Sequence, residues 1–103
     1  MAKNSTFIKL DDTTPDHPKV DGLSNAAFRA WIEAICYCSE YLTDGVISRH
    51  RLGRRDGAKV VTELISVGLV RETEDSAQVV IHDYLEHQTS RQQVVDIRAK
   101  RAR

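Results

Sequence analysis

The sequence predicts a helix-dominated α+β fold, and three observations carry this prediction. Apolar residues recur at helical spacing over a long stretch that begins after Ser24. Two short runs of β-type residues, 69–72 and 79–82, are joined by a polar loop and predict a hairpin. A second capped helical segment follows the hairpin.

The first half of the chain contains the longest predicted helix. The run 6–10 is apolar and predicts either a strand or an arm laid on the core, and 11–22, with its two prolines, predicts a loop. Ser24 is a favourable N-cap for the long helix. Its apolar stripe consists of Phe28, Trp31, Ile32, Ile35, Cys38 and Leu42. We expect Trp31 to anchor the core and the segment 43–45 to end the helix, with a positive φ at Gly45.

Two shorter helices are predicted in the middle of the chain. After a strand fragment at 46–47, Ser48 can cap a helix that continues through Leu52. Asp56 can cap a third helix that extends from Gly57 to about Val67. Its expected buried face is Val60, Val61, Leu64 and Ile65, and its expected open face is Lys59, Thr62, Glu63 and Ser66.

The end of the chain predicts one more helix. Ser90 and Gln93 have the spacing of a capping box. We expect the helix to dock, if at all, through the narrow stripe of Val94, Val95 and Ile97, and to contact DNA or a second protomer. Tyr84 and Leu85 are expected to pack at its root.

The order of these elements is that of a winged helix-turn-helix with an extra C-terminal helix. Two helices joined by a tight turn precede a two-stranded wing, and the strand fragment adds a third strand. The 103 residues suffice for one domain. We divide this domain into an arm and loop (1–23), a winged-helix core (24–88) and a basic C-terminal helix (89–103).

Composition excludes several classes of protein. Charged residues make up 29% of the chain, with 15 bases and 15 acids, which does not fit a disordered polyelectrolyte or a histone-like protein. No apolar run approaches the roughly 20 residues of a membrane span, and the first residues lack the apolar segment of a signal peptide. Cys36 and Cys38 point to different sides of a helix, so we expect reduced thiols and a cytoplasmic location with no membrane partner.

The neutral total conceals a charge asymmetry along the chain. Residues 1–47 hold seven acids and four bases, a net charge of −3, and 48–103 hold eight acids and eleven bases, a net charge of +3. The segments 49–59 and 91–103 each contain five bases and one acid. Such segments can attract an anionic partner, and the alternative is that they are solvated helix faces.

The sequence contains no pattern typical of an enzyme, a cofactor site or a metal site. His82 and His87 are five positions apart and the cysteines lie on another helix, which is not a zinc-binding spacing. No glycine-rich phosphate loop and no nucleophile motif occur. We therefore predict a protein without catalytic activity.

DNA binding is the function that the predicted fold favours. The second helix of a helix-turn-helix enters the major groove, where arginine reads guanine and hydroxyl groups contact phosphates or bases. The predicted DNA-binding residues are Arg49, Arg51, Arg54, Arg55, Lys59, Thr62, Ser66, Arg98, Lys100 and Arg101. The predicted wing tip, 72–76, carries three acids and no base, so we expect it to face protein or solvent rather than DNA.

Several segments in order along the chain also resemble a known family. The stretches 7–12, 17–19, 23–29, 41–47, 68–70 and 82–91 are similar to the winged-helix domain at the N-terminus of phage and prophage replication proteins, of the replisome-organiser or DnaD-like type. The resemblance implies a winged helix that binds double-stranded DNA, or a replication protein, during initiation. Two alternatives stay open, namely a small phage transcriptional regulator and a protein-interaction or homodimerisation module of the same fold.

Overall fold

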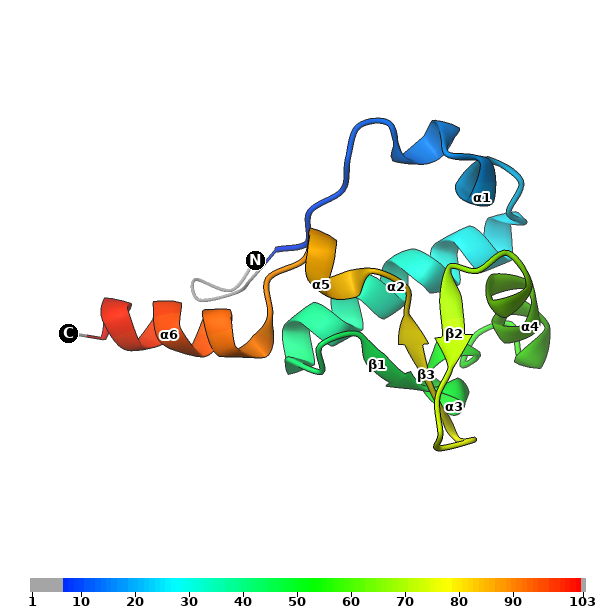
Figure 1. The fold of residues 1–103 in the computed structure, drawn as a ribbon. Helices are drawn as coiled ribbons and strands as arrows, with labels where there is room; N and C mark the ends of the chain where they lie inside the picture. The colour runs from blue at the N-terminus through cyan, green and yellow to red at the C-terminus, as the bar shows by residue number, and fades with distance from the viewer. Residues whose placement is uncertain (1–6, 103) are drawn as a thin grey trace.

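A computed structural model describes residues 7–102, and its elements follow the predicted order with additional short helices before α2 and after β3 (Figure 1). The elements of the first half are η1 (Thr14–Asp16), α1 (Pro18–Asp21), α2 (Asn25–Tyr41), β1 (Val46–Ser48) and α3 (Arg49–Leu52). Those of the second half are α4 (Ala58–Ser66), β2 (Val70–Glu72), β3 (Gln78–Ile81), α5 (Tyr84–His87) and α6 (Arg91–Arg101). The fold is therefore of the α+β class and dominated by helices.

The three strands form one antiparallel sheet in the order β1-β3-β2. Val46 of β1 lies opposite Val80 of β3, and Val70 of β2 lies opposite Ile81. The predicted hairpin is thus confirmed as β2–β3, and β1 pairs with its far side. His82, which was expected in the second strand, follows the end of β3 in a turn.

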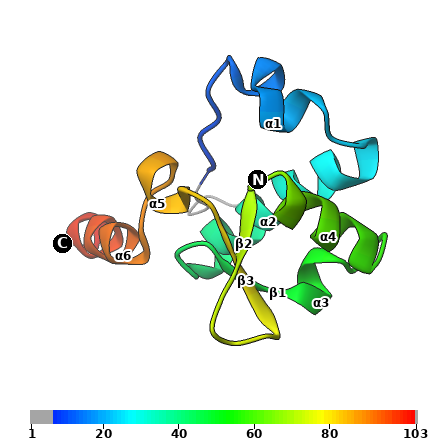
Figure 2. The same ribbon diagram turned by 45° about the vertical axis from the view of Figure 1, so that its right-hand side comes forward.

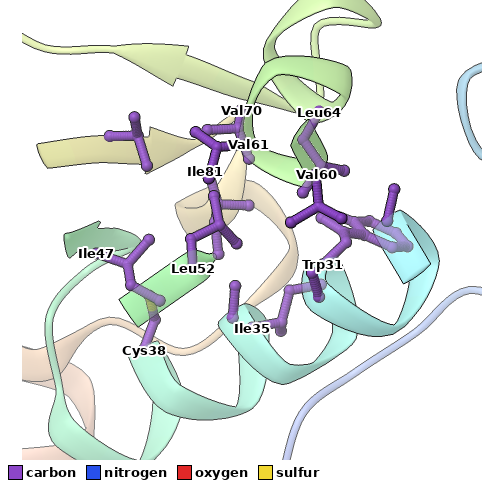
Figure 3. Close-up of a cluster of buried hydrophobic side chains, with 14 of the residues drawn as sticks. Trp31, Ile35, Cys38, Ile47, Leu52, Val60, Val61, Leu64, Val70 and Ile81 are labelled. Carbon is purple, nitrogen blue, oxygen red and sulfur yellow. The ribbon is translucent and has the colours of Figure 1, made fainter. Parts of the chain in front are cut away.

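The core lies between α2, α4 and one face of the sheet (Figure 3). Val79 and Ile81 of β3 are both buried in the cluster that contains Leu64 of α4 and Ile35 of α2, because side chains two apart on a strand share a face. Trp31 is 8% exposed, which confirms its place in the core. These contacts hold α4 against α2 by its inner face.

Helix α2 begins as predicted, and it buries Trp31, Ile35 and Cys38 of the expected stripe but not Phe28. The Ser24 side chain accepts a hydrogen bond from the Ala27 backbone N–H, which confirms the N-cap. Phe28, which was expected in the core, is 39% exposed. Its ring is tilted by 54° against the ring of Trp31, with the two ring centres 6.2 Å apart. Small residues take its place in the core; they are Ala27, Ala30 and Ala34. The alanines allow α2 to approach its neighbours closely.

The end of α2 also differs from the prediction. Leu42, expected on the apolar stripe, adopts the left-handed conformation with a φ of 56° and is the C-cap. Gly45 has the predicted positive φ, 93°, and it is packed so closely that an added Cβ would lie 2.7 Å from Tyr84 Cβ. This contact joins the end of α2 to α5 through the turn before β1.

The prediction that 11–22 is a plain loop is wrong, because this segment contains η1 and α1. Its prolines stand in the first turn of each helix, where a backbone N–H needs no partner. His17 caps α1, its Nδ1 accepting a hydrogen bond from the Lys19 backbone N–H at 3.1 Å. Pro15 and Pro18, which the sequence pattern predicted to be loop residues, instead stand at the starts of helices.

The cap of α4 is a second correction. Asp56 makes no cap, and the N-cap is Gly57, with a φ of 84° and no side-chain hydrogen bond. The turn from α3 needs this left-handed residue, which places Asp56 one position too early to reach the first turn of α4. By contrast, Ser48 caps α3 as predicted, accepting from the Arg51 backbone N–H at 3.0 Å.

The N-terminal arm lies on the core rather than in the sheet, within the residues described. Ile8 packs against the buried cluster, while Thr6 lies outside the described residues. Gln88 holds the arm, since its Nε2 donates to the Lys9 carbonyl at 2.6 Å and its Oε1 accepts from the Lys9 N–H at 2.8 Å. Gln88 is 8% exposed, so both hydrogen bonds of its side-chain amide are shielded from solvent.

Replacing Gln88 by alanine should lower the free energy of unfolding by about 1–3 kcal/mol, because two shielded hydrogen bonds are lost. Amide hydrogen exchange at Lys9 should accelerate at the same time. The control is Gln92→Ala, which removes an exposed bond from Nε2 to Asp96 within α6. Equal effects of the two substitutions on stability and exchange would contradict the role of Gln88.

The last part of the chain contains α5, which the sequence did not predict. It follows Asp83, which has a φ of 56°, and it buries Tyr84 while Leu85 stays 56% exposed. Leu85 is therefore not the packing residue that was expected. The capping box of α6 is confirmed, with Ser90 and Gln93 exchanging hydrogen bonds.

Candidate nucleic-acid interface

Helix α4 follows the turn from α3 (Figure 2), and its outer face is polar. Its inner residues Val60, Val61 and Leu64 are at most 3% exposed, which fixes the rotation of the helix. Lys59, Thr62 and Ser66 consequently lie on the exposed side, as expected from the helical spacing. A hollow of about 320 Å³ is lined by residues of α3 and α4, including His50 and Thr62.

Glu63 does not belong to this open face. Its Oε1 accepts from the Ser24 hydroxyl at 2.7 Å and its Oε2 accepts from the Ser24 backbone N–H at 2.8 Å. These bonds lower the pKa of the Glu63 carboxyl, the backbone N–H contributing most. Glu63 thus joins α4 to the start of α2, a link that local sequence spacing could not reveal.

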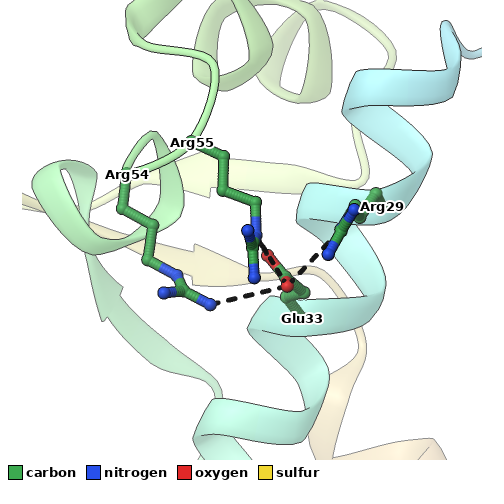
Figure 4. A network of polar contacts seen from close by, with 4 residues as sticks. All are labelled: Arg29, Glu33, Arg54 and Arg55. Atoms are coloured by element: carbon green, nitrogen blue, oxygen red, sulfur yellow. Dashed lines mark hydrogen bonds and ion pairs between the residues drawn. The ribbon is translucent and has the colours of Figure 1, made fainter.

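The turn between α3 and α4 carries Arg54 and Arg55, and both reach toward α2 (Figure 4). Arg55 Nε donates to Glu33 Oε1 at 2.8 Å and to Oε2 at 2.9 Å. Arg54 Nη2 lies 3.5 Å from Glu33 Oε2. Arg29, one turn earlier on α2, places its Nε 3.6 Å from the same oxygen.

The electrostatics of this group, which we call the arginine cluster (Arg29, Arg54, Arg55 and Glu33), follow from its geometry. The hydrogen bond from Arg55 lowers the pKa of the Glu33 carboxyl, and the charges of Arg54 and Arg29 act in the same direction. The same bond raises the pKa of Arg55. Arg29 was not among the predicted DNA-binding residues, because nothing in its local sequence connects it to the turn.

The two predicted arginines of α3 are also engaged within the chain. Arg49 Nε donates to the Ser76 carbonyl at 2.8 Å, and Arg49 Nη2 pairs with Glu72 Oε1 of β2. Arg51 places its guanidinium 4.8 Å from the centre of the Tyr37 ring. Of the five bases of segment 49–59, Lys59 alone has no ion pair, hydrogen bond or ring contact with the residues described.

The hairpin tip is acidic and exposed. Glu74 and Asp75 face solvent, and the loop is held by the Thr73 hydroxyl, which donates to the Asp75 carbonyl at 2.8 Å. Near its root, Arg49 pairs with Glu72, and Arg71 of β2 is exposed. This charge distribution suits a hairpin that avoids the phosphates of a duplex.

Helix α6 forms a second basic region, separate from the first. It projects from the body at the opposite end from α4 in both views (Figures 1 and 2). Arg98, Lys100 and Arg101 are exposed, and only Val94 is buried among the described residues of α6. Its first turn is held by the Arg91 backbone N–H, which donates to Asp44 Oδ1 at 2.7 Å. The structure therefore does not gather the ten predicted DNA-binding residues on one surface.

A cavity of about 530 Å³ lies between the N-terminal arm, α2 and α5. Trp31 and His82 line it, and Trp31 Nε1 and His82 Nδ1 are buried without a hydrogen-bond partner among the described residues. On its rim, Asp83, Glu86 and His87 bring one ligand atom each within 4.8 Å of the others. The sequence predicted no metal site; this grouping depends on α5 and on the left-handed Asp83, neither of which was predicted.

Comparison with known proteins finds no matching family model, no matching curated protein and no matching solved structure. The cysteines are not joined in a disulfide, as their spacing predicted. Among the described residues, every helix is too short or too polar to cross a membrane.

Proposed function

We propose that this chain is a winged helix-turn-helix domain that binds double-stranded DNA with α4 as its recognition helix. The observation that carries the proposal is the position of α4. Its inner face is fixed in the core, its outer face offers Lys59, Thr62 and Ser66, and the arginine cluster flanks its start. The order α3, turn, α4 and β2–β3 hairpin is the helix-turn-helix followed by a wing.

The biological setting that we propose is replication initiation in a phage or prophage. It rests on the resemblance of ordered segments along the chain to the N-terminal winged helix of replisome-organiser proteins. A transcriptional regulator with the same fold would also use α4, and would differ in the position of its sites relative to promoters.

A protein-interaction or homodimerisation module is the second candidate. Two observations favour it, namely the acidic hairpin tip and the exposed apolar side chains of Val95 and Ile97 on α6, which are 42% and 43% exposed. Such a module would associate through α6 and would have no affinity for a duplex.

The test is the mobility of a labelled random-sequence duplex at low salt, followed by selection of bound duplexes from a random pool. DNA binding predicts a retarded complex and enrichment of a common sequence. Sedimentation of the protein alone supplies the other measurement. A self-associated protein that leaves the duplex unretarded would overturn the proposal in favour of the interaction module.

A further inference from the structure

The arginine cluster has more positive charge than its carboxylate can balance. Three guanidinium groups converge on Glu33 from two elements that are distant in sequence, α2 and the turn before α4 (Figure 4). Three positive charges and one negative charge leave a net charge of +2 in these four residues. Like charges gathered in this way attract a further anion.

The hydrogen-bonding capacity of the cluster is also largely unused. Each guanidinium has five N–H donors in a planar fork. Only Arg55 makes short bonds to Glu33, with Arg54 and Arg29 at 3.5 and 3.6 Å. The side chains of Arg29, Arg54 and Arg55 are 62%, 40% and 44% exposed, so their remaining donors face solvent.

The location of the cluster indicates which anion it would meet. Arg54 and Arg55 lie in the turn that leads directly into α4, and a recognition helix in the major groove has phosphates on both sides of it. Arginine forks match the geometry of a phosphodiester, with two donors to two oxygens.

We propose that Arg29, Arg54 and Arg55 form a phosphodiester site at the edge of α4, and that Glu33 is a selectivity residue within it. In the free protein Glu33 occupies the guanidinium groups, and a DNA phosphate replaces it on binding. A DNA phosphate must therefore displace the Glu33 carboxylate from the arginines. This displacement weakens binding to DNA of any sequence. The inference rests on the proposed function and adds Arg29 and Glu33 to the interface.

The experiment compares Glu33→Gln with Glu40→Gln. Both substitutions remove one negative charge from α2, but Glu40 is exposed and makes no ion pair with a described arginine. The probe is a fluorescent random-sequence duplex, titrated at several salt concentrations. The thermal midpoint of each variant verifies folding, and Glu33→Asp serves if the glutamine variant does not fold, since its shorter side chain loosens the same contacts.

Glu33→Gln should bind the random duplex about three- to tenfold more tightly than Glu40→Gln. The reason is that the exposed ion pairs between Glu33 and the arginines no longer compete with the DNA phosphate. The salt slope should steepen by about 0.9 for each further phosphate that the arginines neutralise. Arg29→Ala should weaken binding and flatten the slope by a similar amount. In the Arg54→Ala/Arg55→Ala background, Glu33→Gln should lose most of its effect.

The outcomes separate the two proposals. If the parent protein does not bind a duplex at all, the proposed function fails. If the parent protein binds and Glu33→Gln equals Glu40→Gln, or binds more weakly while folded, the phosphodiester site is overturned and DNA binding stands. The cluster would then only join the turn to α2.

Discussion

Replacing Leu64 by alanine should lower the free energy of unfolding by about 2–5 kcal/mol, as large-to-small substitutions in cores do. Leu64 is 0% exposed and is the largest of the fully buried side chains. It stands where α4 meets α2, and its carbonyl accepts a hydrogen bond from the Leu69 backbone N–H, at the start of the hairpin. A loss of this size is a large fraction of the roughly 5–15 kcal/mol that stabilises a small domain.

Chemical denaturation measures this change, and Thr62→Ala on the outer face of the same helix is the control. The control should stay within about 0.5 kcal/mol of the parent protein, because Thr62 is exposed. If Leu64→Ala costs no more than Thr62→Ala, α4 is not held by its inner face, and the exposed face described above is wrong.

The double substitution Arg54→Ala/Arg55→Ala should weaken duplex binding strongly and reduce stability little. A contact that reads a base is worth about 1–3 kcal/mol, and loss of a phosphate contact lowers the salt slope by about 0.9. The ion pairs with Glu33 are exposed to solvent, which screens them, so their loss should change the stability of the fold little.

Fluorescence anisotropy of a labelled duplex and thermal denaturation measure the two effects separately. A duplex affinity equal to that of the parent protein would show that the turn between α3 and α4 does not contact DNA. A large fall in the thermal midpoint would instead identify the two arginines as structural links to α2.

The features predicted correctly from the sequence are those that local patterns encode. Ser24 and the spacing of Trp31, Ile35 and Cys38 define α2, and Ser90 with Gln93 defines the start of α6. The hairpin follows from two β-type runs and the loop between them. In each case the information lies within one or two turns of the chain.

The features that were missed depend on contacts between distant residues. Gln88 and Lys9 are 79 positions apart, and Arg55 and Glu33 are 22 apart, so no window of sequence connects them. Phe28 and Leu85 have apolar side chains that the packing of neighbouring elements leaves outside the core. The same limit applies to the candidate site, where local charge identified Arg54 and Arg55 but not Arg29 or Glu33.

The salt dependence of duplex affinity of the parent protein tests the central claim most directly. If Lys59 and the arginine cluster meet the DNA backbone, several counterions are released on binding. The logarithm of the affinity should then fall linearly with the logarithm of the salt concentration, with a slope of roughly −0.9 per phosphate contacted. An affinity that does not change with salt, or no affinity for a duplex at low salt, would contradict DNA binding by this chain.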